Sequence, residues 1–141
     1  MFSDKILPNV SKEIYIENQE YSKASLEKVV KASGKCDRLI LRFSKFDLEK
    51  QPDFSGVTYT TTYLSFYNSG DNHNNNWSGN EYRFINMVKG IANCGLKSSL
   101  ATLNISGCGI SVDRVKQIMA SNSMSSIAVT DDKGPKYPIT K

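Results

Sequence analysis

The chain contains few of the residues that build covalent or metal-stabilised frameworks. Its 141 residues include three cysteines, Cys36, Cys94 and Cys108, and a single histidine, His73. An odd number of widely separated cysteines without a C-x-x-C pair predicts neither a disulfide framework nor a zinc site. We therefore expect reduced thiols and no bound cofactor or metal. The expected compartment is intracellular, with the cytoplasm favoured and an organelle left open.

Long apolar runs and targeting signals are also missing. The first residues, MFSDKILPNVSKEIYI, carry early charges and no apolar stretch as long as a signal-peptide core or a membrane span. The acidic Asp4 and the absence of arginine before Arg38 argue against a transit peptide. We expect a soluble protein with one domain and no membrane span.

Charge of one sign is not concentrated in any segment. The chain has 18 basic and 14 acidic residues, a net charge of +4, and its lysines are spread from Lys5 to Lys141. A dispersed positive charge is typical of a solvated surface, whereas nucleic-acid binding needs a basic patch. We therefore expect no nucleic-acid partner.

Catalytic motifs are scarce. The segment SGCGIS, residues 106–111, lacks the third glycine of the dinucleotide fingerprint and the G-K-[ST] of a P-loop. His73 lies in an asparagine-rich segment without a G-x-S-x-G elbow or a cysteine signature. Asp131 and Asp132 are adjacent, so on a strand they would point to opposite faces. We expect no catalytic residue and no enzyme activity.

A recurring pattern of apolar residues is the main feature that the sequence does contain. In LATLNISGCGI, residues 100–110, apolar side chains fall at relative positions 0, 3, 5 and 10, with Cys108 at position 8. The pattern returns at residues 36–46 and, less completely, at three other places. The residues at position 3 are spaced by 25, 25, 39 and 24, and they are Ile14, Leu39, Leu64, Leu103 and Ile127. The long step contains a polar segment, residues 69–80, that we interpret as a surface insertion.

Three segments between these copies have apolar residues at helical spacing. They are residues 22–33, 80–94 and 111–122. Ser111 is expected to cap the third helix, and Asp113 would lie in its first turn. The segment 47–57 contains Pro52 and Gly56, so an extended course or one short turn is expected there. Strands and helices that alternate at a fixed period predict a stacked repeat architecture.

The spacing L-x-x-L-x-[LI]-x-x-C-x-I in LATLNISGCGI resembles the leucine-rich repeat, in particular its cysteine-containing and ribonuclease-inhibitor-like types. YLSFYNSG and the asparagine-rich insert with Trp77 are similar to short, divergent repeat proteins of unicellular eukaryotes with asparagine-rich proteomes. The resemblance implies an α/β solenoid of about five parallel strands in the order 1-2-3-4-5, with helices on the convex side. It covers about residues 11–132 of a single domain, residues 1–141, whose flanks are residues 1–10 and 133–141 and whose polar insertion is at about residues 69–80.

Side chains between the core positions are predicted to lie in three lateral rows on the concave side of the sheet. The rows are Glu13, Arg38, Tyr63, Thr102 and Ser126; Tyr15, Ile40, Ser65, Asn104 and Ala128; and Glu17, Arg42, Tyr67, Ser106 and Thr130. Tyrosine and arginine are enriched at protein interfaces, and the resemblance implies protein binding on this sheet. The predicted partner-binding residues are Tyr15, Glu17, Arg38, Arg42, Tyr63 and Tyr67, helped by His73 and Trp77.

Three classes of function are left open by these observations. The preferred class is a non-catalytic protein-protein interaction module. The second is a structural accessory subunit of a large assembly, because the flanks offer little cover for the exposed end strands of a solenoid. The third is a small α/β enzyme or ligand-binding domain with an open sheet, whose ligand would lie near Ser69, Ser106 and Gly107.

Overall fold

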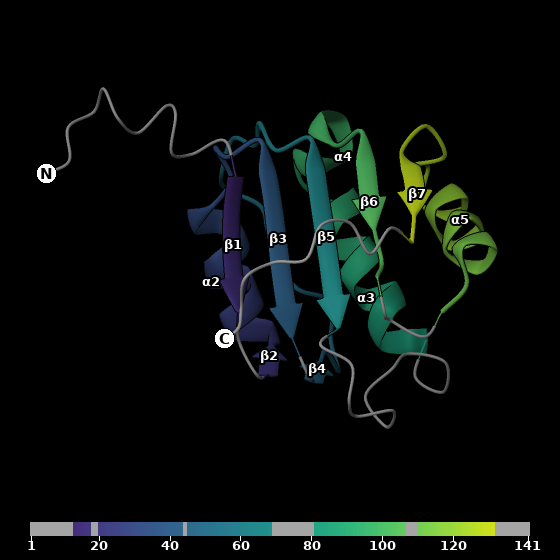
Figure 1. Ribbon diagram of the computed structural model, residues 1–141, viewed down its shortest axis with the longest axis horizontal. Helices are drawn as coiled ribbons and strands as arrows, with labels where there is room; N and C mark the ends of the chain where they lie inside the picture. The colour runs from purple at the N-terminus through teal and green to yellow at the C-terminus, as the bar shows by residue number, and fades with distance from the viewer. Residues whose placement is uncertain (1–12, 18–19, 44, 69–80, 107–109, 132–141) are drawn as a thin grey trace, which may run out of the picture.

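A five-stranded parallel sheet is the centre of the computed structural model, which describes residues 13–17, 20–43, 45–68, 81–106 and 110–131 (Figure 1). The strands are β1 (Glu13–Glu17), β3 (Arg38–Phe43), β5 (Tyr63–Asn68), β6 (Thr102–Asn104) and β7 (Ala128–Thr130), in the order β1-β3-β5-β6-β7. A separate two-stranded sheet pairs β2 (Glu20–Ser22) with β4 (Lys45–Asp47) in parallel. The predicted α/β architecture with a parallel sheet is thus confirmed, whereas β2 and β4 were not predicted.

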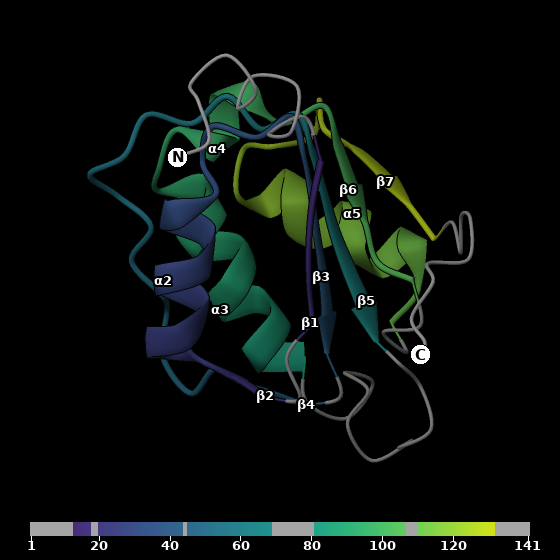
Figure 2. The same ribbon diagram turned by 60° about the vertical axis from the view of Figure 1, so that its left-hand side comes forward.

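The helices α2 (Lys23–Ala32), α3 (Glu81–Ala92) and α5 (Val112–Ser121) lie on the same side of the five-stranded sheet (Figure 2). All three were predicted, and a fourth short helix, α4 (Leu96–Ser99), was not. The Ser111 hydroxyl accepts a hydrogen bond from the Arg114 N–H at 3.1 Å, so the predicted cap of α5 is confirmed. Ser22 caps α2 in the same way, through a reciprocal pair of bonds with Ser25.

One row of aliphatic side chains crosses the five strands on the helix side. Direct pairing partners in this row are Ile14, Leu39, Leu64, Leu103 and Val129. The sequence predicted Ile127 as the fifth member, and this prediction is wrong by two residues. Ile127 lies in the turn before β7, where its N–H donates to the Met124 carbonyl at 3.2 Å. Ile127 and Val129 are both apolar and buried in the core, so the apolar pattern fitted either residue.

The segments that lead into neighbouring strands of the main sheet are also hydrogen-bonded to each other. The Thr60 N–H donates to the Gly34 carbonyl at 2.8 Å, and the Thr62 hydroxyl donates to the Asp37 carboxylate at 2.6 Å. Before the next pair of strands, β5 and β6, the Ala101 N–H donates to the Thr62 carbonyl at 2.8 Å. Hydrogen bonds therefore join neighbouring strands and also the segments that precede them.

The segment between β4 and β5 packs against two helices instead of forming one. No helix or strand is found from residue 48 to residue 62, as the sequence predicts for residues 48–57 of this segment. The Asp53 N–H donates to the Glu27 carboxylate of α2 at 2.7 Å, and Phe54 is buried in the core. On α3, Gly90 lies against Pro52 with no room for a side chain, since an added Cβ would be 2.9 Å from the Pro52 carbonyl oxygen.

Gly90→Ala is expected to destabilise the protein by about 1–2 kcal/mol. The clash with a backbone atom of Pro52 outweighs the roughly 1 kcal/mol by which alanine favours a helix over glycine. Gly95→Ala is the matched control, because a Cβ at that position meets its nearest atom at an ordinary 3.5 Å. We expect Gly95→Ala to change the free energy of unfolding in urea by less than about 0.5 kcal/mol. Equal stability of the two variants would contradict this packing.

Tyr21 is predicted to make unfolding easier at high pH. Burial, followed by the charges of Glu17 and Tyr15, raises the pKa of Tyr21 from 10.0 to about 12. The unfolded chain loses this proton first, so the stabilisation is complete below pH 10 and is lost as the pH rises towards 12. Urea unfolding across this range should therefore show a steep loss of stability that is shallower in Tyr21→Phe. The same pH dependence in both proteins would contradict the assignment.

Candidate functional site

The candidate site is the face of the five-stranded sheet that is turned away from the helices, which we call the strand face. On each strand, residues that alternate with the core row point to this face. The observed pairing gives its three rows as Glu13, Arg38, Tyr63, Thr102 and Ala128; Tyr15, Ile40, Ser65, Asn104 and Thr130; and Glu17, Arg42 and Tyr67. The register of β1, β3, β5 and β6 is as predicted. The prediction for β7 is wrong, because Ala128 and not Ser126 lies beside Thr102.

Arg38 lies between an acidic and an aromatic neighbour on the strand face. Its Nε donates to the Glu13 carboxylate at 3.2 Å, and its guanidinium carbon is 3.9 Å from the centre of the Tyr63 ring. The side chains of Arg38 and Glu13 are 41% and 45% exposed, so the ion pair contributes little to stability. The contact with the Tyr63 ring orients the guanidinium group of Arg38.

Arg42 is held by two tyrosines from the neighbouring strands. Its Nη1 donates to the Tyr15 hydroxyl at 3.4 Å, and its guanidinium carbon is 5.5 Å from the centre of the Tyr67 ring. The hydrogen bond with Tyr15 raises the pKa of Arg42, while burial opposes it, and Glu17 and Tyr67 add to the increase. The charge of Arg42 is therefore permanent.

Much of the hydrogen-bonding capacity of Arg42 is left unused by the described part of the chain. The bond to Tyr15 is longer than a typical N–H···O contact and therefore weak. The Nε of Arg42 is buried and has no hydrogen-bond partner, and no carboxylate among the described residues forms a salt bridge with this side chain. A guanidinium has five N–H donors in a planar fork, so the Nη groups of Arg42 carry more donors than the one bond to Tyr15 uses.

The central residues of the middle row of the strand face, Ile40, Ser65 and Asn104, are buried. Ile40 is 1% exposed, and it lies between Tyr15 and Ser65 in its row. Asn104 donates to the Ser65 hydroxyl at 3.1 Å and accepts from the Thr130 hydroxyl at 2.8 Å. This ladder of polar side chains joins β5, β6 and β7. The sequence placed Ser65 and Asn104 in one row, but it did not indicate that they bond to each other.

Six of the eight predicted binding residues lie on this face. Tyr15, Glu17, Arg38, Arg42, Tyr63 and Tyr67 come from three adjacent strands, β1, β3 and β5. The other two, His73 and Trp77, lie outside the described residues. The same is true of Cys108, which is at position 8 of the repeated apolar pattern.

The described cysteines and acidic side chains form neither a thiol with a lowered pKa nor a metal-binding cluster. Burial raises the pKa of the Cys36 and Cys94 thiols, whereas a nucleophilic cysteine needs a lowered pKa. Within the described ranges, no group of three or more histidine, cysteine, aspartate or glutamate side chains is placed to hold a metal ion. None of the described helices is long and apolar enough to cross a membrane. The side chains gathered on the strand face are tyrosine rings and guanidinium groups that contact each other between neighbouring strands.

Comparison with known proteins adds no family to this description. No protein-family model, no curated protein and no solved structure matches the chain. The function must therefore be inferred from the geometry of the molecule itself.

Proposed function

We propose that this protein is a non-catalytic protein-binding module that holds its partner on the strand face of a short solenoid resembling the leucine-rich repeat. The observation that carries the proposal is the pair of guanidinium–tyrosine contacts on adjacent strands. Arg38 with Tyr63 and Arg42 with Tyr67 make the same kind of contact at two positions four residues apart along β3 and β5.

The arrangement of the layers supports a solenoid. Each strand of the main sheet lies beside the next one along the chain in the order β1-β3-β5-β6-β7. The steps along the row of aliphatic side chains are 25, 25, 39 and 26 residues, so three of the four are nearly equal. The helices α2, α3 and α5 share one side (Figure 2), whereas a doubly wound sheet carries helices on both sides. An open-sheet enzyme or ligand-binding domain is for this reason the less favoured proposal.

The chemistry of the strand face supports protein binding. Tyrosine and arginine dominate the energetic centres of protein interfaces, and strands hold them more rigidly than loops do. Tyr15, Tyr63 and Tyr67 are half-buried, so part of the entropy cost of fixing these rings is already met by the fold. The unused donors of Arg42 favour a partner that presents a carboxylate or a free backbone carbonyl.

A second candidate function is a structural accessory subunit of a larger assembly. The observation that favours it is that the main sheet has strand edges at β1 and β7, and such edges are templates for pairing with another chain. An accessory subunit would be held by its edges in a complex of fixed stoichiometry, whereas the preferred proposal requires the strand face.

The double variant Arg42→Glu/Tyr67→Ala tests the preferred proposal. Used as bait in cell extracts, it should retain less than about a tenth of the partner that the parent protein captures, because it loses the cation and the ring that fixes it. Its thermal midpoint should change by no more than about 2 °C, since neither side chain belongs to the hydrophobic core.

The matched control is Lys28→Glu/Tyr82→Ala. It makes the same change of charge and the same loss of a tyrosine at exposed positions of α2 and α3. This control should capture the partner as the parent does, with the captured proteins identified by mass spectrometry. Undiminished capture by Arg42→Glu/Tyr67→Ala, or an equal loss in the control, would refute the assignment of the strand face.

A further inference from the structure

The outer edge of β7 carries backbone groups that the described part of the chain does not pair. The Ala128 N–H donates to the Ala101 carbonyl at 2.9 Å, and the Thr130 carbonyl accepts from the Ile105 N–H at 2.9 Å. In a parallel strand, alternate residues bond to opposite sides, so the backbones of Val129 and Asp131 are turned outwards. Since β7 is the last strand in the sheet order, no described strand lies beyond it.

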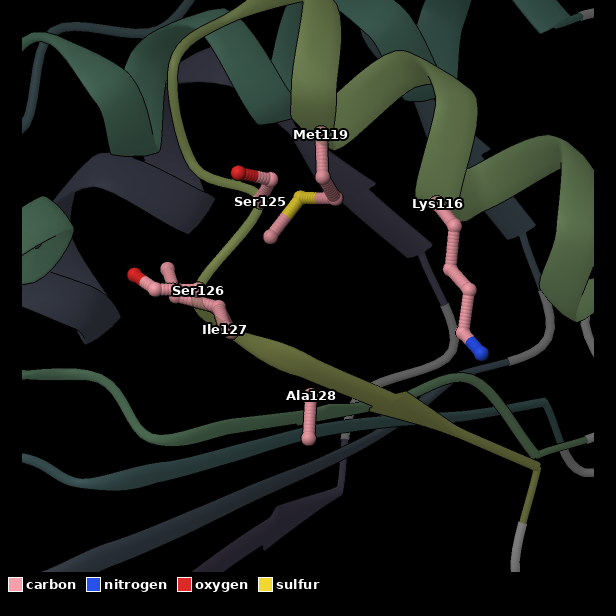
Figure 3. A pocket seen from close by; sticks show the side chains of 6 residues that line it. All are labelled: Lys116, Met119, Ser125, Ser126, Ile127 and Ala128. Carbon is pink, nitrogen blue, oxygen red and sulfur yellow. The ribbon is translucent and has the colours of Figure 1, made fainter.

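A cavity opens beside this edge, between α5 and the start of β7 (Figure 3). Its volume is about 330 Å³, and its lining residues are Lys116, Met119, Ser125, Ser126, Ile127 and Ala128. Met119 and Ile127 are almost fully buried and give the cavity an apolar wall. Lys116 is exposed on α5 with its ammonium group directed towards β7 (Figure 3), and no salt bridge to it is found among the described residues.

The position of the cavity matches the place that the next strand of the sheet would occupy. Each strand of the main sheet directs aliphatic side chains to the helix side, where they contact the same row of the neighbouring strand. A strand added beyond β7 would place such a side chain next to Ile127, beside Met119. One extended chain with an aliphatic residue could therefore both pair with the backbone groups of β7 and fill the cavity.

We propose that the edge of β7 binds one extended segment of a partner protein, parallel to β7, with an aliphatic side chain in the cavity and an acidic residue near Lys116. This is addition of a strand to an open sheet edge. β7 has only three residues, so few backbone bonds form. The aliphatic side chain then supplies most of the affinity, and a lone peptide binds weakly. This surface is separate from the strand face, so either proposal can fail without the other.

A peptide with the sequence SSIAVTD, blocked at both ends, is a suitable probe. It copies residues 125–131, so it can pair with β7 as β7 pairs with β6, and it provides both an aliphatic residue and an aspartate. Titrated into isotope-labelled protein, it should shift the amide resonances of residues 127–131 and of the α5 residues near Lys116 and Met119. Replacing the isoleucine of the peptide by aspartate should abolish these shifts.

Asp131→Pro separates strand addition from simple filling of the cavity. Proline removes an N–H for which no acceptor is found among the described residues, at an exposed position where an edge strand tolerates it. The loss of this donor should weaken peptide binding about three- to tenfold, while the control Asp131→Ala, which keeps the N–H, should bind almost as the parent does. Equal binding by both variants, or no shifts near β7 at millimolar peptide, would overturn the proposal.

Discussion

One row of aliphatic side chains lies side by side on the helix side of the sheet, and the rest of the structure depends on this lateral contact. The row consists of Ile14, Leu39, Leu64, Leu103 and Val129. Aliphatic groups in one row can be removed from water only if each strand lies beside the next in one register. A shift by one residue would turn the apolar set to the opposite face of the sheet. The hydrophobic effect thus fixes the positions of side chains that do not belong to the core.

The strand face follows from the same constraint. Once Leu39 is paired with Leu64, the residues that flank them on the other face have no freedom of register, so Arg38 lies beside Tyr63 and Arg42 beside Tyr67. The two guanidinium–tyrosine contacts are therefore set by packing on the far side of the sheet. A binding surface that is organised in this way needs little rearrangement when a partner arrives.

The sequence predicts the parts of the fold that rest on long periodic patterns, and it fails where the elements are short. The three amphipathic helices and the register of four strands follow from apolar spacing over many residues. β2, β4 and α4 have three or four residues each, too few to show a period. At β7, Ile127 and Val129 are both apolar and both belong to the core, so spacing alone could not decide between them.

Some features of the candidate site could likewise be predicted from the sequence, and others could not. The six strand-face residues follow from register, because a step of 25 residues joins each arginine to its tyrosine. The bonds of Asn104 with Ser65 and Thr130 depend on the rotamers of polar side chains, which no sequence pattern encodes. The cavity beside β7 lies between α5 and the turn before the strand, and no sequence pattern encodes how these two segments pack.

Methyl–methyl nuclear Overhauser effects in protein labelled at isoleucine, leucine and valine test the central claim most directly. The structure predicts strong contacts from Leu64 to Leu39 and Leu103, and from Leu103 to Val129, because each pair lies on directly opposed positions of neighbouring strands. Absence of these contacts, or a contact of Leu103 with Leu39 in place of Leu64, would contradict the single row and with it the strand face that depends on it.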